Sequence, residues 1–81
     1  MKIYDFNGKK NLCGARVKVS RKRLNLSQEQ LAAKMQLEGA ILERDCISRI
    51  EIGTRFVADY ELMILSKILK VSPAYLLGLE D

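Results

Sequence analysis

The chain has 81 residues, which fits one small domain and leaves no room for a second hydrophobic core. Its content of 48% hydrophobic and 30% charged residues is typical of a folded globular chain. No stretch approaches the ~18 consecutive apolar residues of a membrane helix. We therefore expect one soluble domain, and neither a multi-domain enzyme nor a membrane span.

The positive charge is concentrated in the first third of the chain. Residues 1–26 carry eight Lys or Arg against Asp5 alone, a net charge of +7, whereas residues 27–81 carry six basic and nine acidic residues, a net charge of −3. A polyanion such as nucleic acid would favour the basic segment, and a solvated helix face would have the same composition. The charge distribution leaves both interpretations open.

The chain contains two cysteines, Cys13 and Cys46, and no histidine. A Cys/His zinc site or a histidine-dependent catalytic triad therefore cannot be assembled, and we expect no enzyme activity, metal, cofactor or small-molecule substrate. The first residues do not resemble a secretory signal, so free thiols in the cytoplasm are expected. We interpret Cys13 as a core residue and Cys46 as a packing residue in preference to a redox switch.

An irregular arm and a basic helix are predicted for the first part of the chain. Residues 1–11 show no period and contain the turn pair Asn7-Gly8, with a short strand over 3–6 as an alternative. Small or apolar residues then recur at 13, 17, 20 and 24 on one stripe of a helix, and the other faces are basic.

Two further helices follow in the middle of the chain. Ser27 and Gln30 form a capping-box pattern that opens a helix ending near Leu37. Ile41 and Leu42 are interpreted as apolar plugs in the connection. A third helix is predicted over 44–52, with Gly53 just past its end.

The remainder of the chain predicts two more helices. Asp59 is expected to cap a fourth helix that extends to Leu69, and Ser72-Pro73 opens a short last helix through Leu77. The prediction is a compact all-α fold of five helices. It has an arm at 1–11, a domain at 12–78 and a tail at 79–81.

The third helix carries the side chains that suggest a function. Its outward face combines two Arg, an Asp and a Ser, a mixture suited to hydrogen bonding with base edges. Gln28 lies at the start of the preceding helix, where backbone N–H groups and the helix dipole favour a phosphate. These are the parts of a helix-turn-helix motif, in which the second helix enters the major groove.

Four motifs in series then resemble the lambda-repressor-like (Cro/XRE-type) helix-turn-helix DNA-binding family. The motifs, spread over residues 12–78, are Arg16-Val17-Lys18 with Arg21, Leu26-Ser27-Gln28-Glu29-Gln30-Leu31-Ala32, Ile47-Ser48-Arg49-Ile50-Glu51-Ile52-Gly53-Thr54-Arg55, and Leu69-Lys70-Val71-Ser72-Pro73-Ala74-Tyr75-Leu76-Leu77-Gly78. The resemblance implies a transcriptional regulator, a repressor by preference, that binds double-stranded operator DNA as a homodimer on an inverted repeat. The alternative is a protein-binding module on the same fold, such as an antitoxin, for which DNA binding is secondary.

The resemblance also implies roles for individual residues. Base reading falls to Arg44, Asp45, Ser48 and Arg49, and phosphate contact to Ser27, Gln28, Thr54 and Arg55, although Arg55 could instead be merely solvated. Arg21 and Glu51 are expected to form an ion pair, treated as exposed and therefore worth only about 0–1 kcal/mol, or to be unrelated surface charges. Ile64 and Tyr75 are expected at a dimer interface, with Met63 and Ile68 in the core.

One segment departs from the family pattern. Eleven residues separate Met35 from Ile47, where the pattern has about six. Either the second helix gains a turn or the connection bulges, and the extra length leaves the tilt of the third helix open.

Overall fold

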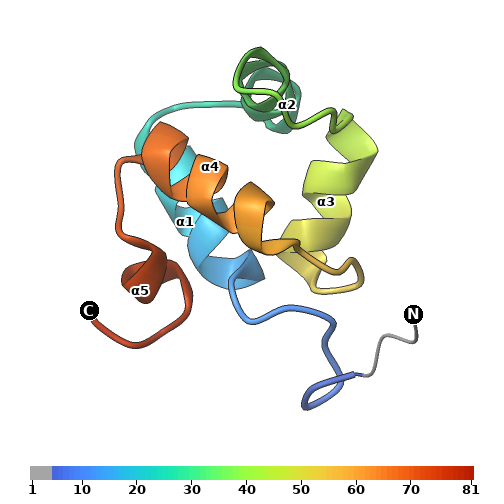
Figure 1. Cartoon of the computed structure of the whole chain (residues 1–81), viewed down its shortest axis with the longest axis vertical. Helices are drawn as coiled ribbons and strands as arrows, with labels where there is room; N and C mark the ends of the chain where they lie inside the picture. Colours follow the sequence, from blue (N-terminus) through green and yellow to red (C-terminus); the bar gives the residue numbers. More distant parts are fainter. Residues whose placement is uncertain (1–4) are drawn as a thin grey trace.

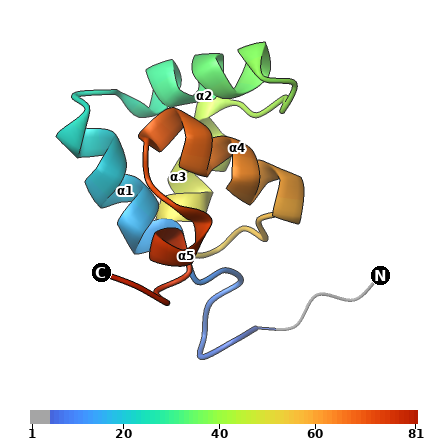
Figure 2. The same cartoon turned by 60° about the vertical axis from the view of Figure 1, so that its left-hand side comes forward.

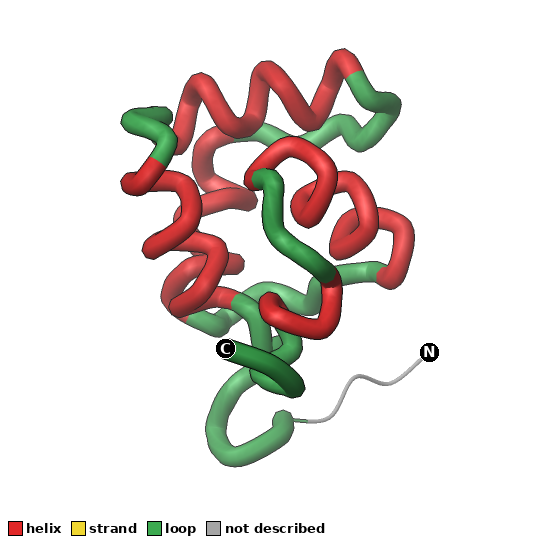
Figure 3. The backbone as a smooth tube through the Cα atoms, turned by 90° about the vertical axis from the view of Figure 1, so that its left-hand side faces the viewer, coloured by secondary structure: helices red, strands yellow, loops and turns green. Residues whose placement is uncertain are grey.

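The computed structural model describes residues 5–81 and is all-helical, as the sequence predicts (Figure 1). The five helices within this range are α1 (Gly14–Arg23), α2 (Gln28–Leu37), α3 (Arg44–Ile52), α4 (Asp59–Leu69) and α5 (Pro73–Leu76). None of them has the length and apolar character needed to span a bilayer. The beginning of the described chain and the C-terminus lie at the end opposite α2 (Figures 2 and 3).

The predicted arm forms a tight turn. Phe6 and Lys9 pair in a single antiparallel bridge, and Asn7 and Gly8 both adopt positive φ between them. Positive φ at both central residues is the type I′ geometry that Asn-Gly favours. Ile3 and Tyr4, half of the alternative strand over 3–6, lie outside the described residues.

The structure confirms the predicted N-caps Ser27 and Ser72 but not Asp59. Ser27 Oγ accepts from the N–H of Gln30, and Gln30 Oε1 accepts from the N–H of Ser27, which completes the capping box of α2. Ser72 Oγ accepts from the N–H of Tyr75 at the start of α5. The prediction of Asp59 as a cap is wrong, because Ala58 occupies the N-cap position and Asp59 is already the first helical residue.

The core is formed by apolar side chains from all five helices. Figures 1 and 2 show α4 crossing the middle of the domain, with α2 on one side and α5 on the other. The completely buried residues of this core include Val17, Leu31, Ile47, Leu65 and Leu76, one from each helix. Burial of this apolar surface is what holds the short helices together, since helices of about ten residues are marginal on their own.

Cys13 belongs to this core, as expected. It is 2% exposed, and burial raises the pKa of its thiol to about 11. A thiol that stays protonated is a poor nucleophile, so Cys13 is a packing residue.

The additional residues between α2 and α3 form a bulged connection. Helix α2 still ends at Leu37, and the chain turns at Gly39 with a φ of +98°. Ala40 and Leu42 are buried beneath the bulge, and the Leu42 carbonyl accepts from Gln36 Nε2 at 3.1 Å. The prediction of Ile41 as a plug is wrong: it is 78% exposed, because alternate residues of this extended segment point inward.

Helix α1 makes very close contact with the last turn of α3. A Cβ placed on Gly14 would lie 2.2 Å from the carbonyl oxygen of Ile50 and 3.0 Å from that of Glu51. No other residue type fits there without moving one of the two helices. Gly14 therefore sets how closely α1 approaches α3.

This contact predicts an unusual response to Gly14→Ala. Replacing a helical Gly by Ala normally stabilises by up to about 1 kcal/mol, but here we expect a loss of about 1–3 kcal/mol in the free energy of unfolding, because the methyl group meets backbone. Urea unfolding followed by circular dichroism measures the change. Ala15→Gly, at the exposed neighbouring position, is the control and is expected to cost only the loss of helix propensity. A Gly14→Ala variant as stable as the wild type would contradict the prediction.

Candidate nucleic-acid interface

The four predicted base-reading residues lie along one face of α3. Positions 44, 45, 48 and 49 follow helical spacing, and Ile47 and Ile50 on the opposite face are buried. Arg44, Asp45 and Arg49 are exposed, and Ser48 is half-buried. The helix therefore presents hydrogen-bonding side chains outward while its apolar face anchors it to the core.

The two arginines of this face are available to a ligand. Arg44 contacts only the neighbouring Asp45, at 3.4 Å between two exposed side chains. An exposed pair of this kind is worth about 0–1 kcal/mol and exchanges readily for another partner. The Arg49 side chain has no hydrogen-bond or ion-pair partner among residues 5–81.

Acidic side chains surround the start of α3. Glu29 of α2, Glu43 and Asp45 line one shallow groove of about 360 Å³ between the two helices, together with Arg44. Carboxylates repel phosphate oxygens but accept hydrogen bonds from amino groups such as cytosine N4. This end of the face is suited to base edges and unsuited to backbone phosphates.

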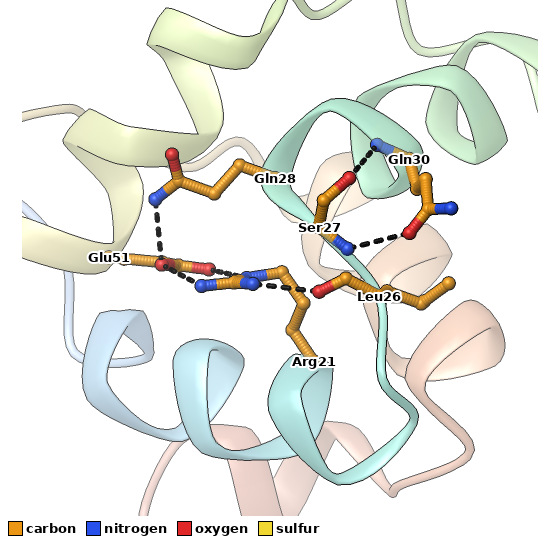
Figure 4. Close-up of polar contacts among 6 residues, drawn as sticks. All are labelled: Arg21, Leu26, Ser27, Gln28, Gln30 and Glu51. Carbon is orange, nitrogen blue, oxygen red and sulfur yellow. Dashed lines mark hydrogen bonds and ion pairs between the residues drawn. The ribbon is translucent and has the colours of Figure 1, made fainter.

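A buried ion pair fixes α3 against α1. Arg21 Nε and Nη2 donate to the two carboxylate oxygens of Glu51 at 2.6 and 3.0 Å (Figure 4). The two side chains are only 9% and 2% exposed, so the expectation of an exposed pair is wrong. The hydrogen bonds that Arg21 donates to Glu51 raise the pKa of Arg21, whose remaining nitrogen donates to the Leu26 carbonyl at 2.7 Å. The pair joins α1, α3 and the loop that leads into α2.

The start of α2 is tied to the same pair. Gln28 Nε2 donates to Glu51 Oε1 at 3.1 Å, and the Gln28 carbonyl points away from that carboxylate (Figure 4). The second N–H of this amide remains available to a ligand. Ser27, by contrast, is exposed and uses its oxygen to cap the helix, which leaves its hydroxyl proton free to donate.

Beyond α3, the structure separates the two predicted phosphate contacts. Thr54 is exposed. Arg55 donates from Nη1 and Nη2 to the two oxygens of Glu61 at 2.9 and 3.1 Å, and from Nη1 to the Phe56 carbonyl. Arg55 is therefore held in an internal ion pair instead of being merely solvated, and its contact with a phosphate stays a prediction. The sequence does not mark Glu61 as the partner of Arg55, because a Glu in the first turn of a helix is commonly a solvated residue that complements the helix dipole.

The Arg55–Glu61 pair predicts a specific dependence of stability on pH. Burial alone would raise the pKa of Glu61, but the hydrogen bonds from Arg55 and from the N–H of Ala58 outweigh it and lower that pKa. The pKa of Glu61 is therefore lower in the folded protein than in the unfolded chain, where it is about 4.3. The stabilisation by the pair is complete at pH values above the unfolded-state pKa, and it is lost as the pH falls through the folded-state pKa. We expect Glu61→Gln to cost about 2 kcal/mol at neutral pH and progressively less below pH ~4.3.

Urea unfolding of the wild type and Glu61→Gln at neutral and acidic pH tests this expectation. The control is Glu38→Gln, which breaks the exposed pair with Lys67 and should show little dependence on pH. If the difference in the free energy of unfolding between the wild type and Glu61→Gln stays constant from neutral to acidic pH, the charge of the Glu61 carboxylate contributes nothing to stability.

A scan of protein-family models finds no match, and neither does a search of curated proteins. Among solved structures, the chain is similar to the P22 c2 repressor protein, determined in complex with a synthetic operator in the presence of Tl⁺. The two share 33% sequence identity with a TM-score of 0.68, over 86% of this chain and 98% of the repressor chain.

The chain belongs to the lambda-repressor-like helix-turn-helix family. In this lambda-repressor-like domain α2 and α3 are the helix-turn-helix pair. The bulged connection between them is therefore an enlarged turn of the motif, and the Arg21–Glu51 pair fastens the motif to α1.

The two residues expected at a dimer interface differ in the structure. Ile64 is 9% exposed and packs in the core, and its role at a dimer interface stays a prediction, whereas its neighbour Met63, expected in the core, is 61% exposed. Helical periodicity predicts which residues share a face, but in the run of four consecutive apolar residues from Leu62 to Leu65 it does not decide which face is inward. Tyr75 is half-buried beneath the Arg16 guanidinium, 4.5 Å from its ring centroid, and its carbonyl accepts from Arg16.

The lambda-repressor-like domain has one large apolar groove on its surface. The groove has a volume of about 630 Å³ and lies between the arm, the α3–α4 loop, α4 and the end of α5. Its lining is mainly apolar, with one charged residue of each sign, Lys10 and Asp59; the apolar members are Leu12, Phe56, Val57, Leu62 and Leu77. No sequence motif indicated this surface, since its residues come from four separate segments.

Proposed function

We propose that this protein is a sequence-specific DNA-binding transcriptional repressor that inserts α3 into the major groove of operator DNA. The observation that carries the proposal is the similarity to the P22 c2 repressor in its complex with operator, which extends over nearly all of that chain. The exposed polar face of α3 and the basic first third of the sequence support it.

Base reading is assigned to Arg44, Asp45, Ser48 and Arg49 on the exposed face of α3. A guanidinium forks onto O6 and N7 of guanine, a carboxylate accepts from N4 of cytosine, and a hydroxyl pairs with several base edges. Arg49 requires no rearrangement, because its side chain has no competing partner among residues 5–81. Arg44 exchanges a weak contact with Asp45 for a base.

Phosphate contact is assigned to the start of α2 and to Thr54. The unpaired N–H groups and the dipole at a helix N-terminus attract a phosphate, and Ser27 and Gln28 add side-chain donors there. Because Gln28 is held by Glu51, its free N–H is oriented before DNA arrives. These contacts position the domain on the duplex and carry no sequence information.

Selection of bound duplexes from a randomised pool at about 150 mM salt tests the proposed function, because non-specific binding is then only about 10⁻⁴ to 10⁻⁶ M. We expect enrichment of an inverted repeat. A folded sample that enriches no sequence would overturn the proposal.

Arg49→Ala is expected to weaken binding to the selected site by about 1–3 kcal/mol and to relax preference at one base position, because a fork onto one base pair is lost. Lys67→Ala removes the same charge from α4 and is the matched control. Affinities for the selected site and for random DNA are measured by fluorescence anisotropy. Equal losses on both DNAs for Arg49→Ala would contradict a base-reading role.

We further propose that two copies dimerise through the apolar groove that contains Phe56 and Leu77. A two-fold axis through the groove can pair Lys10 of one copy with Asp59 of the other, in exchange for the exposed pair that Lys10 makes with Asp5. The domain measures 30 × 28 × 19 Å, so two copies joined along the longest dimension place their centres about 30 Å apart. The half-sites of an inverted-repeat operator are separated by one DNA turn, roughly 34 Å, which two such copies can reach with their α3 helices.

Leu77→Ser is expected to weaken dimerisation at least about tenfold, since each copy loses apolar area and the change counts twice across a two-fold axis. The control is Leu79→Ser, which alters a more exposed leucine outside the groove. Sedimentation equilibrium, with and without operator DNA, gives the dissociation constants. An unchanged dimer in Leu77→Ser would exclude this groove as the interface.

A further inference from the structure

The arm is hydrogen-bonded to the last turn of α3. Lys9 Nζ donates to the Ile52 carbonyl at 3.0 Å, and the Lys10 N–H donates to the Gly53 carbonyl at 2.8 Å. Asn11 Nδ2 donates to the Ile50 carbonyl at 3.1 Å. The last carbonyls of a helix lack partners within the helix, and these donors supply partners to the carbonyls of Ile50, Ile52 and Gly53.

Asn11 also joins two other parts of the chain. Its Nδ2 reaches the Arg55 carbonyl in the α3–α4 loop at 2.8 Å, and its Oδ1 accepts from the N–H of Gly14 at 2.8 Å. One half-buried amide thus caps the start of α1 and binds both the end of α3 and the loop that follows. The amide has a single correct orientation, because the reversed one would set its oxygen against two carbonyls.

Helix α3 is consequently attached to α1 by two separate ties. The Arg21–Glu51 pair holds it at the far end of α1, and Asn11 holds it at the beginning. Along α1 the two points of attachment, Gly14 and Arg21, are seven positions apart, a distance of about 10 Å. A single tie would allow α3 to pivot against α1, whereas two ties with Gly14 in close contact between them fix its angle.

The start of α3 is held by apolar packing of Leu42 and Ile47 and has no comparable set of side-chain hydrogen bonds. Glu43 makes no side-chain capping bond, and Arg44 and Asp45 are exposed. The angle of the base-reading face is therefore set from the opposite end of the helix. A small rotation at Ile50 is carried along α3 to the residues that meet the bases.

We propose that Asn11 is a positioning residue for base reading: it touches no DNA and fixes the tilt of α3 in the major groove. The inference rests on the proposed function and assigns a part of its specificity to a residue outside the helix-turn-helix. Recognition groups must be held within about 0.5 Å and 10–20° to discriminate. Without the two donors of Asn11, α3 samples several tilts and distinguishes the bases less well.

Asn11→Ser isolates this role from helix capping. Residue 11 precedes the N-cap Cys13, and a serine hydroxyl there can still accept from the N–H of Gly14 three residues on, but it is too short to span to the Ile50 and Arg55 carbonyls. Ser72→Ala is the matched control, because it removes a cap from α5, at the start of another helix, and destabilises the fold without touching α3. Both variants are studied at a temperature where circular dichroism shows them fully folded.

The measured quantity is the ratio of affinity for the selected site to affinity for random DNA. We expect Asn11→Ser to lower this ratio about tenfold, a loss similar to that caused by one incorrect base pair in the binding site. The affinity for random DNA should stay unchanged. Ser72→Ala should keep the wild-type ratio. Amide hydrogen exchange at Gly53 and Thr54 should speed up only in Asn11→Ser.

Each outcome is decisive. A lowered ratio with faster exchange in Asn11→Ser alone supports the positioning role. An unchanged ratio, or one lowered equally in Ser72→Ala, overturns it and leaves the proposed function intact. If the wild-type protein itself prefers no sequence, the proposed function fails and the positioning role fails with it.

Discussion

The buried Arg21–Glu51 pair is the interaction on which the arrangement of this domain depends. Both charges are almost completely removed from water, so each requires the other, and removing one partner of such a pair costs about 3–5 kcal/mol. The whole stability of a domain is only about 5–15 kcal/mol. The remaining hydrogen-bonding capacity of the pair is used by the Leu26 carbonyl and by Gln28. One ionic contact therefore fixes the relative positions of α1, α2 and α3, which apolar packing alone would leave freer to slide.

The local features of the fold could be predicted from sequence because they are decided by nearby residues. The capping box of Ser27 and Gln30 and the Ser72-Pro73 start both concern residues within one helical turn. Periodicity placed Ile47 and Ile50 inward for the same reason. The pairing of Arg21 with Glu51 was anticipated from family resemblance, but its burial was not, since exposure depends on what the rest of the chain packs around it.

The features that sequence could not supply depend on how the chain packs in three dimensions. Arg55 pairs with Glu61 across a loop, and Asn11 reaches Ile50 across 39 positions, with no periodic signal to mark either contact. Ile64 and Met63 are adjacent in a run of four consecutive apolar residues, so only the tertiary packing decides which of them is inward. Assignment of roles in DNA contact is a further step, because it depends on a partner that binds to these surfaces.

In the bulged turn between α2 and α3, the residues that are free to vary are different from those that stabilise the fold. Ala40 and Leu42 anchor it from below, while Leu37 and Ile41 project from its surface and contribute little to the core. The connection can therefore change in length or composition between these anchors without loosening the helices on either side. New contacts beside α3 can therefore arise in this loop, by evolution or by design, while the residues that orient α3 stay the same.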